Sequence, residues 1–403
     1  MPDASVQHPG RKLAALTGLR GVGMLLIVVS HTSFHSGDKL RGALAPVLAR
    51  MDLGVALFFA LSGFFLYRSF ARAALEGRPL PSVRAFAAHR AVRILPAYWL
   101  AVLAAWVLIP ANHDADVSDL IRQLTLTRIY QQHDTSFFEG TVQTWSLDTI
   151  VAFYLFVPVV AWIAGAGLVG APPRRALRRQ SVVIAACVAA SPVFTAAWAA
   201  GWIPWPLGHH WLPAYLGWFG AGMALALASL VLARNEAGPV SRVAGVAASV
   251  PGTVYLVALS AFAIAATPIA GPGGLELGDG FHQVARIGLL GVIACLIVLP
   301  PALDPSSTNI ATRVLSVPPL LWLGEISYGV FLYHVVALTL VADWLDIPPF
   351  TGRFWTLTAA TLAVTIPTAW LSYRYVESPL IDRVRRLIGQ PIVASESAIR
   401  TRI

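Results

Sequence analysis

Apolar stretches long enough to cross a lipid bilayer as helices dominate this sequence. A bilayer core about 30 Å thick needs about 20 apolar residues at the helical rise of about 1.5 Å per residue. The chain is 57% hydrophobic and only 12% charged. We expect spans at 14–34, 53–70, 94–110, 145–166, 181–201, 211–233, 247–268, 284–302, 318–342 and 354–374. The sequence therefore predicts an all-α, polytopic integral membrane protein with about ten transmembrane helices.

Arginine is distributed unevenly between the connections, and this distribution sets the expected orientation. Arginines cluster between the second and third spans, between the fourth and fifth, and after the tenth, whereas the charged residues of the connection 111–143 are mostly acidic. Because basic connections stay in the cytoplasm, we expect both termini to be cytoplasmic and 111–143 to be external. We expect a membrane domain over 1–388, followed by a flexible cytoplasmic tail at 389–403.

The net charge of +9 follows from this topology. We interpret it as attraction to anionic membrane lipids, and we expect no nucleic-acid partner. The two cysteines, Cys187 and Cys295, both fall within predicted spans, so no disulfide framework is implied. The sequence does not indicate an oligomeric state.

The first predicted span contains two polar residues on one helical face. Arg20 and His31 are eleven positions apart, which is three helical turns with roughly 20° left over, and about 16 Å of axial rise. Both are costly at membrane depth, and such residues usually face a cavity or a site. The alternative is that Arg20 snorkels to the interface and His31 lies at headgroup level. With the expected orientation, Arg20 lies toward the cytoplasm and His31 toward the outside.

Three polar residues from distant parts of the sequence fall at a similar outer depth. They are His31, Asp148 and His334. Each could be a satisfied polar residue of the core, but their agreement in depth predicts a common site. Trp145 and Ser146 precede Asp148 at the outer end of the fourth span.

A second group of candidates lies at the inner end. Arg90 and Arg93 are three positions apart at the start of the third span, which suits one phosphate-bearing ligand. Glu325, low on the ninth span, pairs at helical spacing with Tyr328 on the same face. Plain positive-inside topology is the alternative for these arginines, but it accounts less well for Arg20, which is embedded in apolar sequence.

Six motifs in order resemble the membrane acyltransferase-3 family. They are the Arg20–His31 pair, GVALFFALSGFFLYR at 54–68, HRAVRILPAYW at 89–99, QTWSLDTIVAFYLFVP at 143–158, GEISYGVFLYH at 324–334 and YRYVESP at 373–379. The resemblance covers nearly the whole chain. It implies ten or more helices around an acyl-transfer site, and an enzyme that O-acylates sugars or lipids of the bacterial envelope from the inner (plasma) membrane.

The resemblance implies roles for the polar residues. Cytoplasmic acetyl-CoA, the acyl donor and co-substrate, would place its phosphates near Arg20, Arg90 and Arg93. His31 would act as general base toward an acceptor hydroxyl that enters from outside. The remaining expected roles are an orienting residue for the histidines (Asp148), a shaped acyl pocket (Tyr328 or Trp145) and donors for the oxyanion (Ser62, Tyr328 or His334). Direct transfer and a covalent enzyme intermediate both stay open.

The acceptor is expected to be a glycan or glycolipid of the envelope that reaches the site within or just above the membrane. The heavy use of alanine and arginine, with two lysines only, is typical of a high-GC genome. A trehalose mycolate-type lipid of an actinobacterial envelope is therefore one candidate acceptor.

One position departs from the family pattern. The family commonly has W-S-L-x-x-E in this span, and the carboxylate position here is Ile150. Isoleucine can neither orient a base nor accept a proton. Three explanations are open. Asp148 has taken over the role of the missing carboxylate, the residue was substituted to trap or inactivate the protein, or the activity has diverged. Asp148 points to another side of a helix, so direct replacement needs local distortion.

Three further interpretations compete with this assignment. The His31-x3-His35 spacing and the pair His209–His210 could suggest a metal, but we expect His35 in the outer headgroup region and His209–His210 in an external turn, so we expect no metal site. Ser62-Gly63 favours close helix packing by small residues over a nucleophile. A transporter or flippase of lipid or sugar is the alternative function, since a polar interior would also serve a carrier. Broken helices or inverted repeats would favour a carrier, and neither is evident.

Overall fold

The structure is a computed structural model that describes residues 9–132, 137–234, 238–274, 276–304 and 309–388, with side chains from residue 14 onward. The predicted tail 389–403 lies outside these residues and stays a prediction. Within the described residues the chain forms helices and turns and no strand. The all-α prediction is therefore confirmed.

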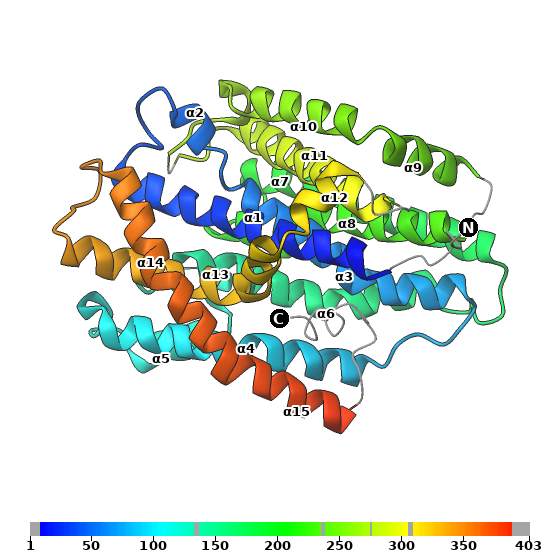
Figure 1. Cartoon of the computed structure of the whole chain (residues 1–403), viewed down its shortest axis with the longest axis horizontal. Helices are drawn as coiled ribbons and strands as arrows, with labels where there is room; N and C mark the ends of the chain where they lie inside the picture. Colours follow the sequence, from blue (N-terminus) through cyan, green and yellow to red (C-terminus); the bar gives the residue numbers. More distant parts are fainter. Residues whose placement is uncertain (1–8, 133–136, 235–237, 275, 305–308, 389–403) are drawn as a thin grey trace, which may run out of the picture.

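Nine segments are long and apolar enough to cross a membrane among the described residues. Most of their main helices run along the longest dimension of the molecule, and α14 crosses it steeply (Figure 1). They are α1 (Pro9–Ser36), α3 (Leu53–Leu75), α4 (Val83–Leu108), α6 (Trp145–Gly165), α7 (Pro173–Ala199), α8 (Leu212–Ala233), α11 (Gly280–Leu303), α13 (Pro318–Trp344) and α14 (Phe354–Ser372). Shorter helices are α2 (Ala45–Leu48), α5 (Val117–Leu124), α9 (Pro239–Ser249), α10 (Pro251–Ala265), α12 (Ile310–Leu315) and α15 (Ser378–Ile388).

The predicted span at 247–268 is wrong as a single straight helix. The chain there forms α9 and α10, which meet at 87°. Proline lacks the backbone N–H that a helix needs, and the residue before it avoids the helical region. Val250 accordingly has φ −124° and ψ 54°, and α10 begins at Pro251. Counting this bent pair as one crossing gives ten spans, and without it there are nine.

α4 and α7 begin well before their predicted spans, at the arginine-rich ends. α4 begins at Val83, where the Ser82 side chain accepts a hydrogen bond from the backbone N–H of Ala85. Arg90 and Arg93 therefore lie on a helix, one turn apart, and not in a connection. Arginine favours helix and extends its charged head beyond the apolar region, so the apolar run alone underestimates the helix.

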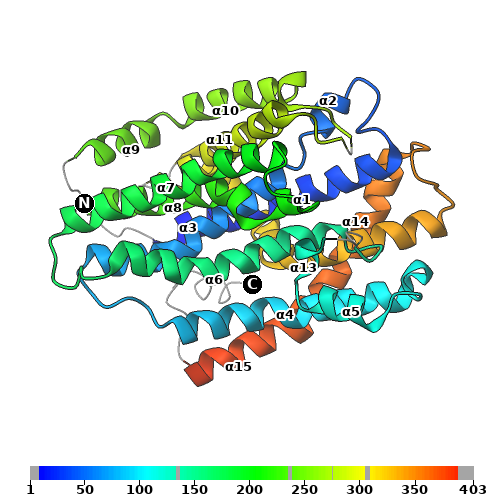
Figure 2. The ribbon, with the colours of Figure 1, turned by 180° about the vertical axis from the view of Figure 1, so that it is seen from behind.

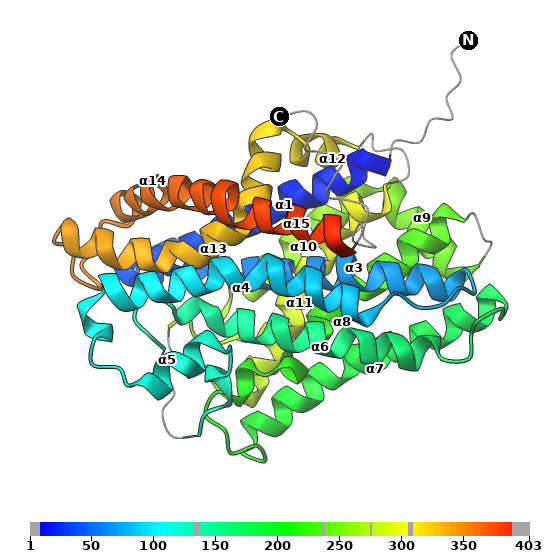
Figure 3. The same ribbon diagram turned by 90° about the horizontal axis from the view of Figure 1, so that it is seen from below.

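The packing divides the helices into two groups that meet around the site. α1 packs against α13 and α14, while α3 packs against α8 and α11, and α1 contacts α3 between the groups. α4 lies between α15 and α6 (Figure 3). The end of the molecule where α1 finishes also carries α2, α5 and the α13–α14 connection, while α9 and α15 lie toward the other end (Figures 1 and 2).

Glycines bring α3 and α8 into backbone contact. A Cβ added to Gly63 would lie 2.0 Å from the carbonyl oxygen of Phe219, and one added to Gly222 would lie 1.8 Å from that of Ala60. Small residues allow this approach where membrane helices pack closely. The packing role expected for Ser62-Gly63 therefore falls to Gly63.

Candidate active site

A cavity in the middle of the bundle collects most of the residues singled out by the sequence. We call it the arginine cavity, and it contains about 1460 Å³ of space, including open solvent at its mouth. Its polar wall comes from α1, α3, α4, α6 and α13 and consists of Thr17, Arg20, Ser62, Arg90, Arg93, Ser146, Tyr154, Glu325 and Tyr328, with Tyr373 beyond α14. Ile150 lies in the same wall among apolar side chains such as Phe58 and Leu147.

The three arginines give this cavity positive charge. The guanidinium carbon of Arg90 lies 5.9 Å from the ring centre of Phe86, and its buried Nε has no hydrogen-bond partner. Arg20 and Arg93 interact electrostatically with the carboxylate of Glu377, a residue only 4% exposed. Glu377 lies in a π-helical turn, Tyr373–Glu377, of the kind often found at functional sites.

Two predicted polar groups of this cavity already use their hydroxyl protons. Tyr328 donates to the carbonyl oxygen of Ile94 at 2.8 Å, and Ser146 donates to that of Gln143 at 3.0 Å. A hydroxyl has a single proton to donate. These two residues therefore shape the wall in this arrangement, and neither is placed to donate to an oxyanion.

A second cavity, the histidine cavity, lies directly beside the first. Its polar and aromatic wall consists of Ser30, His31, Lys39, Asp52, Trp145, His209, His210, Tyr215, Trp218, Gln283 and Arg286. Ile27 and Val55 line both cavities. One face of α1 therefore carries Arg20 into the first cavity and His31 into the second, with Ile27 at the boundary.

His31 and His334 contact each other through their rings. The Nε2 of His334 lies 3.2 Å from the Nδ1 of His31, and the ring centres are 5.0 Å apart. The Nδ1 of His334 lies 2.8 Å from the carbonyl oxygen of Phe331, and the Nδ1 of His31 lies 3.0 Å from that of Ile27. His334 is fully buried and lines neither cavity.

These contacts assign the proton positions in neutral rings. A carbonyl oxygen only accepts, so the Nδ1 of His334 must carry its proton and the Nε2 must carry a lone pair. The Nδ1–H of His31 then donates toward that lone pair and toward Ile27. The Nε2 of His31 is left as the lone pair that can accept a proton, which is the form a general base requires.

Asp148 lies in a different environment from the histidine pair. Its carboxylate accepts a hydrogen bond from the backbone N–H of Ile129 at 3.4 Å, and the side chain is 3% exposed. Trp211 donates its indole N–H to the carbonyl oxygen of Ile129 at 2.9 Å. The hydrogen bond of Asp148 therefore fixes the connection before α6, and it does not reach His31 or His334.

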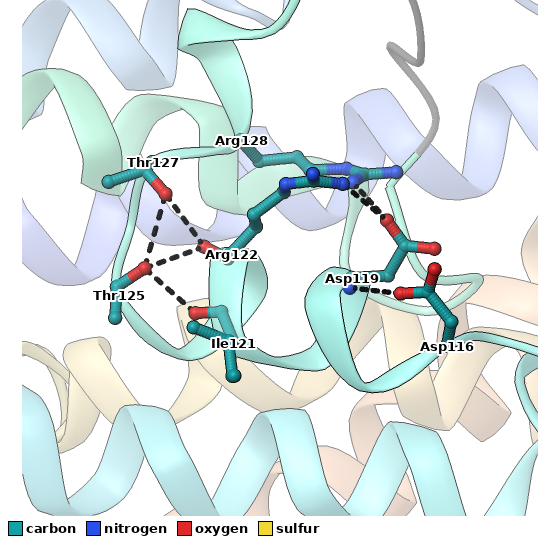
Figure 4. A network of polar contacts seen from close by, with 7 residues as sticks. All are labelled: Asp116, Asp119, Ile121, Arg122, Thr125, Thr127 and Arg128. Carbon is teal, nitrogen blue, oxygen red and sulfur yellow. Dashed lines mark hydrogen bonds and ion pairs between the residues drawn. The ribbon is translucent and has the colours of Figure 1, made fainter.

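Ion pairs hold the neighbouring part of that connection. The carboxylate of Asp119 binds Arg128 at 2.8 Å and Arg122 at 3.3 Å, and Asp116 caps the start of α5 (Figure 4). Thr125 and Thr127 bind each other and the carbonyl oxygen of Arg122 at the end of that helix (Figure 4). The described part of the predicted external connection is thus folded and held by these contacts, and its residues line neither cavity.

The sequence missed several residues of the histidine cavity. Arg286 on α11 forms an ion pair with Asp52, which precedes α3, and its Nε lies 3.1 Å from the carboxylate. Trp145 stacks on His210 with ring centres 4.1 Å apart. The signal for the first pair is a carboxylate just before one predicted span and an arginine near the start of another, but sequence alone does not say which helices are neighbours. His209 and His210 lie in a short turn, Gly208–His210, and they also line the cavity.

Comparison with known proteins agrees with this geometry. An acyltransferase domain model of the acyltransferase-3 type matches residues 13–374. The chain belongs to the acyltransferase-3 family. It is 26% identical to the acyltransferase MdmB of Streptomyces mycarofaciens, with 96% of this chain and 97% of the relative covered. No solved structure matched the chain.

Two further relatives point to membrane enzymes. The membrane-bound transacylase BcsY of Komagataeibacter xylinus is 25% identical, with 94% of this chain and 85% of the relative covered. The peptidoglycan O-acetyltransferase OatA of Listeria monocytogenes is 22% identical, with 93% of this chain and 57% of that longer relative covered. Together with the apolar helices, these matches show a multi-pass membrane acyltransferase.

Proposed function

We propose that this acyltransferase moves an acyl group, acetyl in the simplest case, from acyl-CoA to a hydroxyl of an envelope glycan or glycolipid. The observation that carries the proposal is the pair of adjacent cavities. The arginine cavity has the charge to hold the phosphates of CoA, and the histidine cavity contains a base. Since Ile27 and Val55 line both, the two cavities adjoin inside the bundle, and the thioester would pass between these side chains.

The orientation follows from the arginines. We place the arginine cavity on the cytoplasmic side of a bacterial inner membrane, where acyl-CoA is present, with both termini on that side. The histidine cavity then faces outward. α5, in the predicted external connection, lies at the end of the molecule where α1 finishes (Figure 2).

The reaction is a direct transfer assisted by His31. The Nε2 of His31 takes the proton of the acceptor hydroxyl while its oxygen attacks the thioester carbonyl. The new C–O bond forms, the C–S bond breaks, and the CoA thiolate leaves and is protonated. His334 is a positioning residue, because its lone pair holds the Nδ1–H of His31.

Aromatic side chains in the histidine cavity support a sugar acceptor. Trp145, Tyr215 and Trp218 lie in one wall, with Trp145 and Tyr215 ring centres 5.4 Å apart. Their apolar faces suit the C–H face of a sugar ring. The indole N–H of Trp218 donates to the carbonyl oxygen of Ile287, which fixes the orientation of that ring. The name of the OatA relative, an O-acetyltransferase, agrees with transfer to oxygen.

The test is transfer of labelled acetyl from acetyl-CoA to envelope lipids in proteoliposomes that contain the purified protein. Trehalose mycolate is one of the acceptors assayed. We expect label in an ester of the acceptor and release of CoA thiol in equal amount. Movement of lipid across the bilayer without any dependence on CoA would instead support a transporter or flippase and contradict the proposal.

Replacing His334 tests its positioning role. We expect His334→Ala to lower kcat about 10–100-fold, as loss of an orienting partner of a functional histidine does. His334→Gln keeps an oxygen that can accept the His31 proton, so it should recover part of the rate. The acyl-CoA KM should stay the same in both. A purely structural role would lower stability in both variants without this recovery, and would leave the pH profile of kcat unchanged.

Ile150 is tested by introducing the carboxylate that the family commonly has. Ile150 lies in the arginine cavity, so Ile150→Glu adds a negative charge where we place the CoA phosphates. We expect the acyl-CoA KM to rise about tenfold, because like charges repel in a cavity shielded from water. Ile150→Gln, equally long but uncharged, is the matched control. A tenfold gain in kcat with Ile150→Glu would show that a catalytic carboxylate is missing here.

A further inference from the structure

A third hollow opens beside the histidine cavity, and we call it the entrance hollow. Its walls come from α2 and its flanking turns, and from the segment between α10 and α11. Its charged and polar residues are Lys39, Arg50, Thr267, Glu276 and His282. Lys39 lines this hollow and the histidine cavity alike, so the two spaces meet at its side chain.

The charges around this meeting point do not balance. Lys39, Arg50 and Arg286 are cations that interact with the one carboxylate of Asp52. That carboxylate pairs with Arg286 through Oδ2, and its buried Oδ1 has no hydrogen-bond partner among the described residues. In the part of the chain that the structure describes, neither Lys39 nor Arg50 has a carboxylate within ion-pair distance. Glu276 and Asp279 are exposed, and the carboxylate of Asp279 lies 2.8 Å from His282, so neither carboxylate pairs with Lys39 or Arg50.

Arg50 presents an unused donor although it is almost completely buried. Its side chain is 2% exposed, and it donates through Nε to the carbonyl oxygen of Ala265 at 2.6 Å and through Nη2 to that of Gly271. Its buried Nη1 has no hydrogen-bond partner. A buried, unsatisfied charged donor is costly, and a bound anion would remove that cost.

Lys39 also has donors to spare. Its ammonium makes one hydrogen bond, to the Ser30 hydroxyl at 3.2 Å, although an ammonium can donate three. It interacts electrostatically with His31, whose ring lines the same cavity. A group held by Lys39 is therefore close to the base.

We propose that Lys39 and the Nη1 of Arg50 bind an anionic group, a phosphate or a carboxylate, of the acceptor in the entrance hollow. This inference rests on the proposed function, because it assigns a charge to the acceptor. The anion anchors one part of that molecule while a nearby hydroxyl reaches His31. The anion can come from the phosphate of a lipid-linked sugar or from the carboxylate of an acidic sugar.

Binding can be measured without any acyl transfer, so failure here is distinguishable from failure of the proposed enzyme activity. The full-length protein in detergent is titrated with inorganic phosphate, glucuronate or glucose at constant ionic strength, and its Tm is recorded. A ligand that binds the folded state raises Tm with its concentration. We expect phosphate or glucuronate to raise Tm and glucose to leave it unchanged. Phosphate alone indicates a phosphorylated acceptor, and glucuronate alone indicates an acidic sugar.

Variants assign the effect to these two side chains. Lys39→Gln should weaken anion binding at least tenfold, and so should Arg50→Gln. If Arg50→Gln does not fold, Lys39→Gln alone decides, because Lys39 makes only one side-chain hydrogen bond. Arg41→Gln is the matched control, since Arg41 is exposed, close in sequence and outside all three walls. No Tm shift with either anion, or the same shift in Lys39→Gln, would overturn the proposal.

Discussion

Replacing His31 by alanine is expected to lower the rate of acyl transfer about 10²–10⁴-fold, the usual contribution of a general base. The Nε2 of His31 holds the lone pair in the histidine cavity, because its Nδ1–H is engaged by His334 and Ile27. The loss should appear in kcat for the acceptor reaction. Binding of acyl-CoA in the neighbouring cavity should not change. Initial rates with labelled acetyl-CoA measure kcat, and equilibrium binding of labelled acetyl-CoA measures the affinity for the donor.

His35→Ala is the control for this variant. His35 lies one turn further along α1, and its Nε2 lies 3.4 Å from the carbonyl oxygen of Ile347, outside both cavities. It should keep the parental rate. Transfer that survives in His31→Ala at more than a tenth of the parental rate would show that another group removes the proton.

Replacing Arg90 by glutamine is expected to raise the acyl-CoA KM about 10–100-fold, with a smaller effect on kcat. A hydrogen bond to a charged group contributes about 1.5–3 kcal/mol, and each 1.4 kcal/mol is about tenfold in affinity. Arg90 has an unpartnered, buried Nε in the wall of the arginine cavity, so its donors are available to a phosphate. The measurement is the acyl-CoA dependence of the initial rate.

Arg84→Gln is the matched control, because Arg84 lies on the same helix, is exposed and lines no cavity. It should leave the KM unchanged. Free CoA should also compete less well with acyl-CoA in Arg90→Gln than in the parent. An unchanged KM in Arg90→Gln would place the donor elsewhere.

The sequence predicted most of the architecture because membrane helices leave a direct signal. Apolar length identified nearly every long helix, and helical spacing put Arg20 and His31 on one face of α1. It did not find the break between α9 and α10, because the apolar run continues across Pro251 while the backbone does not. It also predicted the third span at 94–110, whereas α4 runs from Val83 to Leu108. The start was placed too late because arginines extend a helix without being apolar.

The site was less predictable, because it depends on which helices are neighbours. Depth brought Arg20, Arg90 and Arg93 to one level, and the structure places all three in one cavity. Depth also grouped Asp148 with the histidines, but its hydrogen bond goes to Ile129, in a connection whose fold no periodicity describes. The pairing of Asp52 with Arg286, far apart in the sequence, likewise requires the packing of α11 beside α3.

In the proposed reaction, donor and acceptor enter from opposite ends of the bundle and meet at Ile27 and Val55. Proteoliposomes of one known orientation, with labelled acetyl-CoA on the arginine side only and acceptor on the histidine side only, test it most directly. We expect labelled acceptor on the histidine side, and a rate about 10²–10⁴-fold lower with His31→Ala. Labelled product only when donor and acceptor share one side would contradict it.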